Sequence, residues 1–236
     1  MSLAVAGARA SLLPSSVAAA ASSSRSRLLA LPPRHRRPHG SLAAARRRLR
    51  VRMARTESTG VSVGFRAPEF ELPEPLTGNL WTLDDFEGNP ALLVMFICNH
   101  CPFVIHLKKD IAKLTSFYVE KGLGAVAISS NSIRTHPQDG PERMAEEAKL
   151  FKYPFPYLYD ESQEVAKAFG AVCTPEFYLF KDGRRPFELF YHGQFDDSRP
   201  SNNVRVTGRD LSRAIDCALS GQELPFVQKP KYLCLL

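Results

Sequence analysis

Two cysteines separated by two residues are the part of this sequence best suited to chemistry. Cys98 and Cys101 lie in the segment C-N-H-C-P, which directly follows the continuous apolar run Ala91–Ile97. A run of this kind predicts a strand that is buried on both faces. Behind the cysteines, apolar residues recur at helical spacing from Val104 to Tyr118, which predicts a helix. A C-x-x-C pair at such a strand-to-helix junction is typical of a redox-active dithiol.

The junction places the first sulfur at the N-terminus of the predicted helix. Unpaired N–H groups and the helix dipole favour a thiolate there, and the thiolate is the species that attacks a disulfide. An imidazolium at His100, between the two cysteines, would stabilise the thiolate further. We therefore expect Cys98 to have a pKa well below that of a free thiol and to act as the nucleophile. Cys101, one turn on, would displace a partner from the mixed disulfide that forms.

A metal site is the main alternative for the same residues. C-x-x-C is half of many zinc sites, and donors elsewhere in the chain could complete a zinc or copper site: His100, His106, His136, Cys173 and His192. However, neither a second C-x-x-C nor a histidine pair at finger-like spacing follows. An inert buried pair of thiols is a further alternative. The strand–C-x-x-C–helix order favours redox chemistry, so we predict neither a bound metal nor a cofactor.

Three more cysteines bring the total to five: Cys173, Cys217 and Cys234. An odd number at uneven spacing is unlike the disulfide framework of a secreted protein. Cys173 stands two residues before Pro175 and is a candidate third redox thiol. We expect Cys217 to be a packing residue, because an unbridged cysteine commonly behaves as a small apolar side chain.

The rest of the hydrophobic pattern alternates between strands and helices. Apolar alternation punctuated by Pro and Gly predicts a short hairpin within residues 64–83. Further strands are predicted at 123–129, 156–159, 177–180 and 187–191, and further helices at 141–151, 162–169 and 208–219. Lys181-Asp182-Gly183 is typical of a hairpin turn between the last two strands. This order predicts an α/β fold in which helices flank a central mixed sheet.

Positive charge is concentrated at the start of the chain. Residues 1–56 contain 12 Arg and no Asp or Glu, and they are rich in Ala and Ser. This composition matches an organellar transit peptide; the uncharged first eight residues and frequent hydroxyl side chains favour the chloroplast stroma over the mitochondrion. A disordered basic arm that binds an acidic surface is the alternative.

The charge balance of the remaining chain excludes several classes of protein. Residues 57–236 carry 19 basic and 24 acidic side chains, which argues against a nucleic-acid-binding domain. The least charged stretch of the leader is rich in Ala and Ser and contains Pro14, which argues against a membrane span. We predict three regions: a transit peptide at 1–56, one folded domain at 57–225 and a C-terminal tail at 226–236.

The order of these motifs resembles the thioredoxin superfamily, because Thr174-Pro175 follows the C-x-x-C pair and precedes a strand. Two stretches, A-P-x-F-x-L at 67–72 and W-T-L-x-x-F-x-G at 81–88, are similar to the peroxiredoxin-type branch, the alkyl hydroperoxide reductase/thiol-specific antioxidant group. More narrowly, C-N-H-C-P and the segment D-D-S-R-P at 196–200 resemble a peroxiredoxin-like group found in bacteria and plastids. The resemblance covers residues 64–225. It implies a thioredoxin-like fold in which a cis Pro175 faces the redox pair and Thr174-Pro175 aligns the backbone of a partner.

The sequence also departs from these patterns. Peroxiredoxins carry Thr three residues before the peroxide-reacting Cys, whereas Met95 stands three residues before Cys98. Thioredoxins carry Trp immediately before the first Cys and a buried Asp six residues before it, whereas this chain has Ile97 and Leu92 there. Members of the peroxiredoxin-like group usually end in a Gly-Cys-Ser-Ile-Lys-Trp-like tail, of which only Cys234 has an equivalent here.

These observations together predict a thiol–disulfide oxidoreductase with an antioxidant role in redox homeostasis. Its partners would be disulfide-bearing proteins or small thiols, and we expect no nucleic acid or membrane among them. A thiol peroxidase that uses the same two thiols is one alternative. A non-catalytic binding or metal-chaperone module with a thioredoxin-like fold is the alternative from another class.

Overall fold

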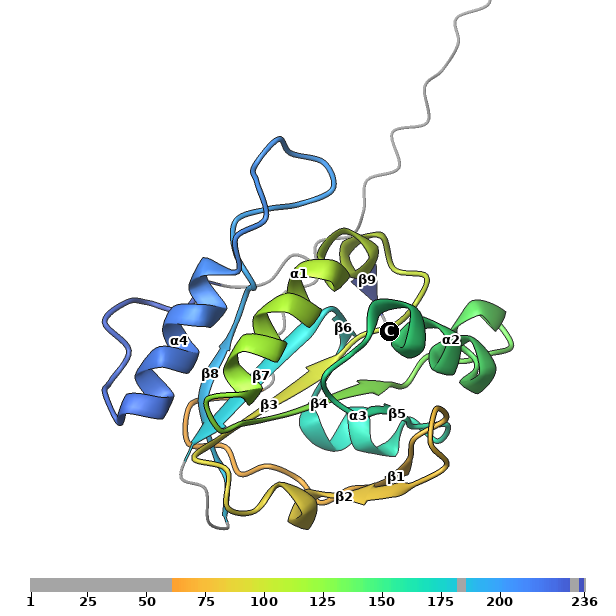
Figure 1. The fold of residues 1–236 in the computed structure, drawn as a ribbon, viewed down its shortest axis with the longest axis horizontal. Helices are drawn as coiled ribbons and strands as arrows, with labels where there is room; N and C mark the ends of the chain where they lie inside the picture. The colour runs from red at the N-terminus through yellow and green to blue at the C-terminus, as the bar shows by residue number, and fades with distance from the viewer. Residues whose placement is uncertain (1–60, 182–185, 230–233, 236) are drawn as a thin grey trace, which may run out of the picture. The chain divides into compact units, whose positions relative to one another are not determined.

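A five-stranded mixed sheet lies at the centre of the fold, in a computed structural model that describes residues 61–181, 186–229 and 234–235 (Figure 1). The strand order is β5-β4-β3-β7-β8. Strands β3 (Ala91–Phe96), β4 (Leu123–Ser129) and β5 (Tyr157–Tyr159) run parallel to one another. Strands β7 (Glu176–Lys181) and β8 (Glu188–Gly193) are antiparallel to their neighbours. The predicted α/β class and the mixed sheet are therefore confirmed.

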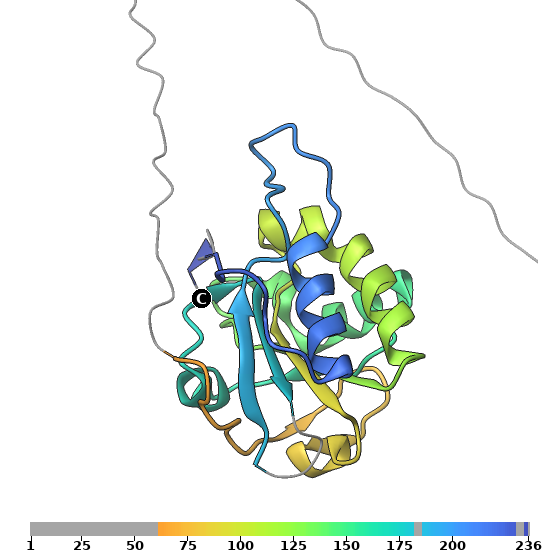
Figure 2. The same cartoon turned by 90° about the vertical axis from the view of Figure 1, so that its left-hand side faces the viewer.

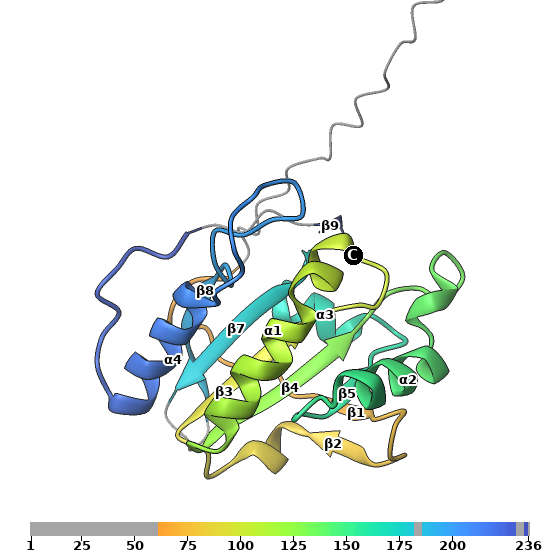
Figure 3. The same cartoon turned by 45° about the horizontal axis from the view of Figure 1, so that its top comes forward.

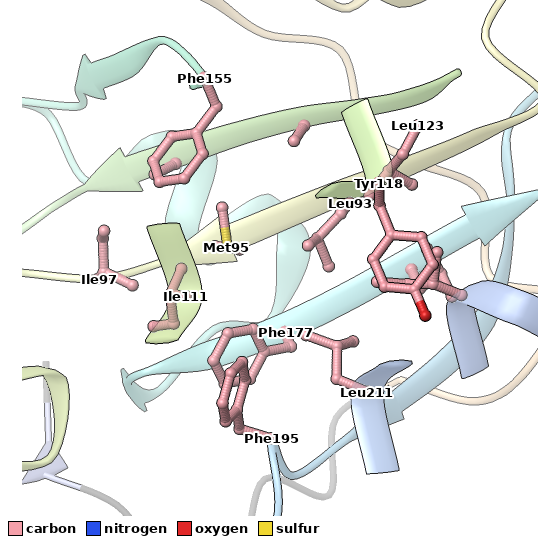
Figure 4. Packing of buried hydrophobic residues seen from close by; sticks show 14 of the residues in the cluster. Leu93, Met95, Ile97, Ile111, Tyr118, Leu123, Phe155, Phe177, Phe195 and Leu211 are labelled. Carbon is pink, nitrogen blue, oxygen red and sulfur yellow. The ribbon is translucent and has the colours of Figure 1, made fainter. Parts of the chain in front are cut away.

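The long helices pack on one face of this sheet (Figures 2 and 3). They are α1 (Pro102–Val119), α2 (Pro141–Phe151) and α4 (Arg209–Ser220). Alternate residues of β3, including Leu93 and Met95, share a buried cluster with Ile111 of α1 and Leu211 of α4 (Figure 4). Every residue of β3 is buried, because helices or loops cover both faces of the strand. This burial of both faces explains why the residues of Ala91–Ile97 form a continuous apolar run.

The opposite face is covered by smaller elements. Helix α3 (Glu164–Phe169) contributes Phe169 to a second buried cluster that contains Leu92, Val94 and Phe96 of β3. A hairpin of β1 (Glu71–Pro73) and β2 (Leu80–Thr82), followed by the short helix η1 (Leu83–Phe86), joins the same cluster. Packing on both faces of β3 thus holds the strand that leads to the C-x-x-C segment.

Besides η1, three short elements near the cysteines have no counterpart among the predicted ones. They are a single helical turn, η2 (Pro137–Asp139), and two strands of two residues, β6 (Cys173–Thr174) and β9 (Cys234–Leu235). Strands β6 and β9 pair with each other in an antiparallel sheet of their own. All three belong to the surroundings of the cysteines.

Two predictions fall outside the described residues. These are the transit peptide at 1–56 and the hairpin turn at Asp182-Gly183 between β7 and β8. Within the described ranges, no helix combines the length and the apolar character needed to cross a membrane.

Candidate active site

The two cysteines of the C-x-x-C segment lie at the end of β3 and the beginning of α1. Ile97 continues the ladder beyond the strand by donating a hydrogen bond to the carbonyl of Ile128. Cys98 follows in the loop, and Cys101 is the N-cap residue of α1, with Pro102 at the first helical position. Proline is suited to that position because it has no N–H to leave unpaired. The strand-to-helix junction predicted for the pair is therefore confirmed.

Thr174, from the segment that leads to Pro175, contacts the sulfurs of both cysteines. Its hydroxyl lies 3.2 Å from Cys98 Sγ, and its carbonyl oxygen accepts a hydrogen bond of 3.2 Å from Cys101 Sγ. The Thr174–Pro175 peptide bond is cis, as the resemblance implied. The structure thus brings together Cys98, Cys101 and the Thr174-Pro175 segment from three separate parts of the sequence.

Both cysteines are unbridged and almost completely buried, with exposed fractions of 1% for Cys98 and 0% for Cys101. A hydrogen bond joins the two thiols, so the pKa of each depends on whether the other carries a proton. The hydrogen bond between them lowers the pKa of Cys101 to about 6 against the opposing effect of burial, and the Thr174 hydroxyl and the backbone N–H groups of Val104 and Phe103 lower it further. The dithiol therefore loses its first proton readily, and the negative charge lies on Cys101.

The same interaction has the opposite effect on Cys98. The hydrogen bond to Cys101 raises the pKa of Cys98, and so do burial and the nearby negative charge of Asp139, although the Thr174 hydroxyl opposes them. The predicted low pKa of Cys98 is therefore wrong for the reduced protein. The physical reason is first the hydrogen bond between the two sulfurs, in which Cys98 keeps its proton and donates it to Cys101, and then the burial of Cys98; the charge of Asp139 adds to both.

Asp139 is the residue of this site that the sequence did not reveal. It is fully buried and lies in η2, about 40 residues after the cysteines in the chain. Its Oδ1 accepts hydrogen bonds from the backbone N–H groups of Asn99 (2.8 Å) and His100 (3.1 Å). Its Oδ2 shares a hydrogen bond with His100 Nδ1 and accepts another, of 2.9 Å, from Asn131 Nδ2. One carboxylate therefore holds the loop between the cysteines in place.

His100 is bound to this carboxylate rather than to a sulfur in the contacts that the structure describes. Its side chain is 15% exposed, and its ring stacks on that of His136, with ring centroids 3.8 Å apart. Asn99 is held as well, because its amide donates to the carbonyl of Gln138 and its Oδ1 accepts from the hydroxyl of Tyr157. The segment between the cysteines is thus a fixed part of the site.

Cys173 lies next to Thr174 in β6 and is also fully buried. Its thiol donates a hydrogen bond of 3.4 Å to Glu176 Oε2, and the other oxygen of that carboxylate lies 2.9 Å from His192 Nε2. The structure therefore places the candidate third thiol against a carboxylate of β7. Whether it takes part in redox chemistry stays a prediction.

The donors considered for a metal are mostly dispersed or already bonded. Among the described residues, Cys98, His100 and Asp139 form the one group of three whose ligand atoms lie within 4.8 Å of one another. His192 is paired with Glu176, and His106 Nε2 lies 2.6 Å from the hydroxyl of Ser198. Sulfur, imidazole and carboxylate are zinc ligands, but here the imidazole and the carboxylate bind each other and Asp139 also accepts two backbone N–H groups. This arrangement fits a positioning network better than a metal centre.

Comparisons with known proteins agree with this geometry. The model of the AhpC/TSA family matches residues 63–185. The chain is 28% identical over 123 residues to a Mycobacterium tuberculosis protein named "Putative peroxiredoxin Rv2521", a match that covers 52% of this chain and 73% of that protein.

Solved structures extend the similarity beyond the matched family region. A hypothetical protein from Sinorhizobium meliloti is 47% identical, with a TM-score of 0.73 over 76% of this chain and 96% of that one. An uncharacterized conserved protein from Geobacillus kaustophilus is 45% identical, with the same TM-score over 78% and 95%. A thiol:disulfide interchange protein of the thioredoxin family from Chlorobium tepidum, at 16% identity and a TM-score of 0.51 over 68% and 99%, shares the fold.

Proposed function

Because the chain belongs to the AhpC/TSA family of thioredoxin-like redox proteins, we propose that it is a thiol–disulfide oxidoreductase whose Cys98 and Cys101 alternate between dithiol and disulfide. The observation that supports this most directly is the position of both sulfurs, 3.2 Å from oxygens of the single residue Thr174. The proposed partners are disulfide-bearing proteins or small disulfides.

The proposed reaction begins with a thiolate of the coupled pair. Cys98 transfers its proton to the Cys101 sulfur along the hydrogen bond between them and attacks one sulfur of the incoming disulfide. The disulfide bond of the substrate breaks, its second thiol leaves as a thiolate, and a mixed disulfide with Cys98 remains. Cys101 then attacks Cys98 Sγ and gives its proton to the departing substrate sulfur, which leaves as the first substrate thiol. Two electrons pass from the pair to the substrate, and the Cys98–Cys101 disulfide is the oxidised product.

The surrounding residues position the pair for these steps. We assign Thr174 the role of holding both sulfurs and, together with Pro175, of aligning the backbone of the partner. The N–H groups of Val104 and Phe103 stabilise the Cys101 thiolate, which makes it a good leaving group in the reverse reaction. Asp139 is a positioning residue, because it acts through the loop and through His100. In this proposal, His100 modulates the charge next to Cys98.

Exchange with a disulfide test peptide measures this function. The reduced full-length chain should reduce the peptide and accumulate a Cys98–Cys101 disulfide, and Cys98→Ser should abolish the reaction. Cys217→Ser is the matched control, since Cys217 lies in α4 and outside the site. Equal exchange by the Cys98→Ser variant and the unaltered chain would refute the proposal.

A thiol peroxidase is the second candidate, favoured by membership of the AhpC/TSA family and by the name of the mycobacterial relative. In that reaction the Cys98 thiolate takes an oxygen atom from a peroxide to form a sulfenic acid, and Cys101 then forms the disulfide and releases water. Met95 occupies the place of the peroxide-orienting Thr and is completely buried in β3. We therefore expect the rate of oxidation by hydrogen peroxide to be that of an ordinary thiol. A rate far above it, lost in Cys98→Ser, would favour the peroxidase instead.

For the cellular location, we propose that residues 1–56 direct the chain to the chloroplast stroma. The support is their composition, which combines 12 Arg with no acidic residue. A fluorescent protein fused behind residues 1–60 should enter chloroplasts. If the fusion accumulates in mitochondria, residues 1–56 are a mitochondrial targeting segment instead. If it enters neither organelle, the proposed targeting role is overturned.

A further inference from the structure

A hollow lies between helices α1 and α2, outside the site that contains the cysteines. It has a volume of about 500 Å³, and its lining consists of Lys109, Ala112, Leu150, Phe151 and Lys152. Figures 1 and 3 both show α1 between α2 and α4 on one face of the sheet. The hollow thus belongs to the helix layer, and it combines an apolar lining with two lysines.

Contacts between the two helices fix the shape of this hollow. Lys108 of α1 forms an ion pair of 2.7 Å with Glu147 of α2, and both side chains are largely buried. The Lys108 ammonium group also lies 4.3 Å from the centre of the Phe151 ring. Since Phe151 lines the hollow as well, the same residues that join α1 to α2 hold part of its lining in place.

The apolar side chains of this region are open to a partner. Leu150 is 73% exposed, more than any other large apolar side chain in a described helix or strand. Ile105, one helical turn before Lys109 and one turn after Cys101, is 49% exposed. Exposed apolar surface therefore extends along α1 from the hollow toward the redox pair.

The two lysines of the hollow supply positive charge that the domain does not neutralise. Lys109 and Lys152 are exposed, and within the described ranges neither forms an ion pair. The acidic residues of α2 nearest to Lys152 in sequence, Glu146 and Glu147, are already paired with basic side chains. Asp110 lines a second hollow, on the side of α1 that faces α4. The electrostatic potential of the first hollow therefore favours an anionic occupant.

We propose that the hollow between α1 and α2 docks an acidic segment of the protein whose disulfide exchanges with Cys98 and Cys101. A large apolar side chain of that segment packs on Leu150, and carboxylates beside it pair with Lys109 and Lys152. This inference rests on the proposed function, because it takes the exchange partner to be a protein. A membrane fits the surface less well, since a flat bilayer does not fill a hollow.

The position of the hollow suits a segment that also reaches the cysteines. Helix α1 begins directly after Cys101, and a rise of 1.5 Å per residue places Lys109 and Ala112 about 12 and 16 Å along its axis. About four or five residues of extended chain span that distance. Because both sulfurs of the pair are almost completely buried, they offer a partner little surface. Contacts beside them therefore have to supply most of the affinity.

Exchange kinetics of the reduced full-length chain with two peptides test the docking site. The single cysteine of each peptide is bound in a mixed disulfide to a chromophoric thiol. One peptide carries a leucine between glutamates, five residues from the cysteine, and the other has lysines in place of the glutamates. The acidic peptide should have a KM about three- to tenfold lower, and added salt should reduce this preference. Lys109→Glu should remove most of the preference without changing kcat, and Leu150→Ser should raise the KM for both peptides.

Two variants elsewhere in the fold are the matched controls. Lys167 is an exposed lysine of α3, which covers the opposite face of the sheet. Lys167→Glu gives the chain the same net charge as Lys109→Glu and leaves residues 1–56 in place, so it should keep the preference for the acidic peptide. Leu80→Ser is the control for Leu150→Ser, because Leu80 is also exposed, in β2.

A neutral small disulfide, bis(2-hydroxyethyl) disulfide, separates the docking site from the proposed function. If the unaltered chain does not exchange with it or with either peptide, the proposed function itself is overturned. If exchange proceeds but the two peptides have equal KM values, or if Lys109→Glu and Lys167→Glu have equal effects, the docking site alone is overturned. Binding to phosphatidylserine vesicles that Lys109→Glu abolishes, with no effect of that variant on the peptides, would assign the surface to a membrane instead.

Discussion

Two buried pairs of a carboxylate and an imidazole lie close to the redox centre, Asp139 with His100 and Glu176 with His192. In both pairs the carboxylate side chain is fully buried, and it also accepts a hydrogen bond from a backbone N–H group. The chemistry of the two pairs is therefore nearly the same. Their positions in the chain are different.

Asp139 binds the loop that contains the cysteines, whereas Glu176 binds the segment that leads to the cis proline. Asp139 Oδ1 receives the N–H groups of Asn99 and His100, and its charge raises the pKa of Cys98. Glu176 Oε2 receives the N–H of Val172 and the thiol of Cys173. The comparison indicates that the Asp139 pair affects redox chemistry as well as stability, and that the Glu176 pair affects mainly stability.

Replacement of Glu176 by Ala should have the largest effect on folding. It removes the carboxylate that accepts hydrogen bonds from the N–H of Val172 and pairs with His192. Breaking a buried pair in this way costs about 3–5 kcal/mol, which urea unfolding would measure. Glu176→Gln keeps an acceptor and should lose less. A loss below about 1 kcal/mol for the Ala variant would show that this pair does not hold β6 and β7 together.

Asp139→Asn should have a smaller effect on stability and a specific effect on the cysteines. The amide keeps an oxygen for the N–H groups of Asn99 and His100, so we expect a loss of about 1–3 kcal/mol. Because the negative charge is removed, the pKa of Cys98 should fall, since that charge raises it. Titration of the rate at which Cys98 is alkylated, located by peptide mapping, would detect the fall. Glu176→Gln should leave the titration unchanged, and equal titrations in both variants would contradict the proposed difference between the pairs.

The coupled thiols predict the pH dependence of the reduced protein. Alkylation of the pair should increase about tenfold per pH unit below the Cys101 pKa of about 6 and level off above it. Folding lowers this pKa from 9.0. The Cys101 thiolate therefore adds stability to the folded state as the pH rises from about 6 to 9, and that contribution is lost as the pH falls back toward 6. Above pH 9 the raised pKa of Cys98 has the opposite effect on stability. Cys101→Ser should remove both effects of the Cys101 thiolate, and an alkylation profile that first rises near pH 9 would contradict the coupling.

Thr174→Val should have the smallest effect of the series. The substitution removes the hydroxyl at 3.2 Å from Cys98 Sγ, a hydrogen bond that lowers the pKa of both thiols. One hydrogen bond of this kind contributes about 0.5–1.5 kcal/mol, so alkylation near pH 6 should slow roughly two- to tenfold. Thr174→Ser keeps a hydroxyl and should restore most of the rate. Identical rates for the Val and Ser variants would show that this hydroxyl does not affect the thiolate.

The sequence predicted the parts of this molecule that depend on local pattern. The seven apolar residues of Ala91–Ile97 and the helical spacing from Val104 to Tyr118 predicted β3 and α1, with the cysteines at their junction. Burial of both faces of a strand and of one face of a helix leaves a periodic signal in neighbouring positions. The C-x-x-C junction could therefore be recognised from the residues alone.

The contacts that decide the chemistry leave no such signal. Asp139 precedes Gly140 and Pro141 and resembles an ordinary turn residue, and nothing in the sequence relates it to Cys98 about 40 residues earlier. Glu176 lies in a strand in which every residue but the last is buried, and only its pairing with His192 explains a carboxylate there. The register of Cys234 with Thr174 likewise depends on tertiary packing. A local pattern also could not assign the thiolate to Cys101, because the hydrogen bond between the two sulfurs, their burial and the nearby charge of Asp139 exist only in the folded chain.

The proposed redox pair is tested most directly by its equilibrium with a glutathione redox buffer. The full-length chain with Cys234→Ser isolates the proposed pair from the tail, and peptide mapping identifies each disulfide. We expect a single reversible two-electron transition that joins Cys98 to Cys101, leaves Cys173 and Cys217 as thiols, and disappears in the Cys98→Ser variant. If Cys98 and Cys101 stay reduced across the whole range of buffers, or if either of them forms a disulfide with Cys173, the proposed Cys98–Cys101 redox pair is contradicted.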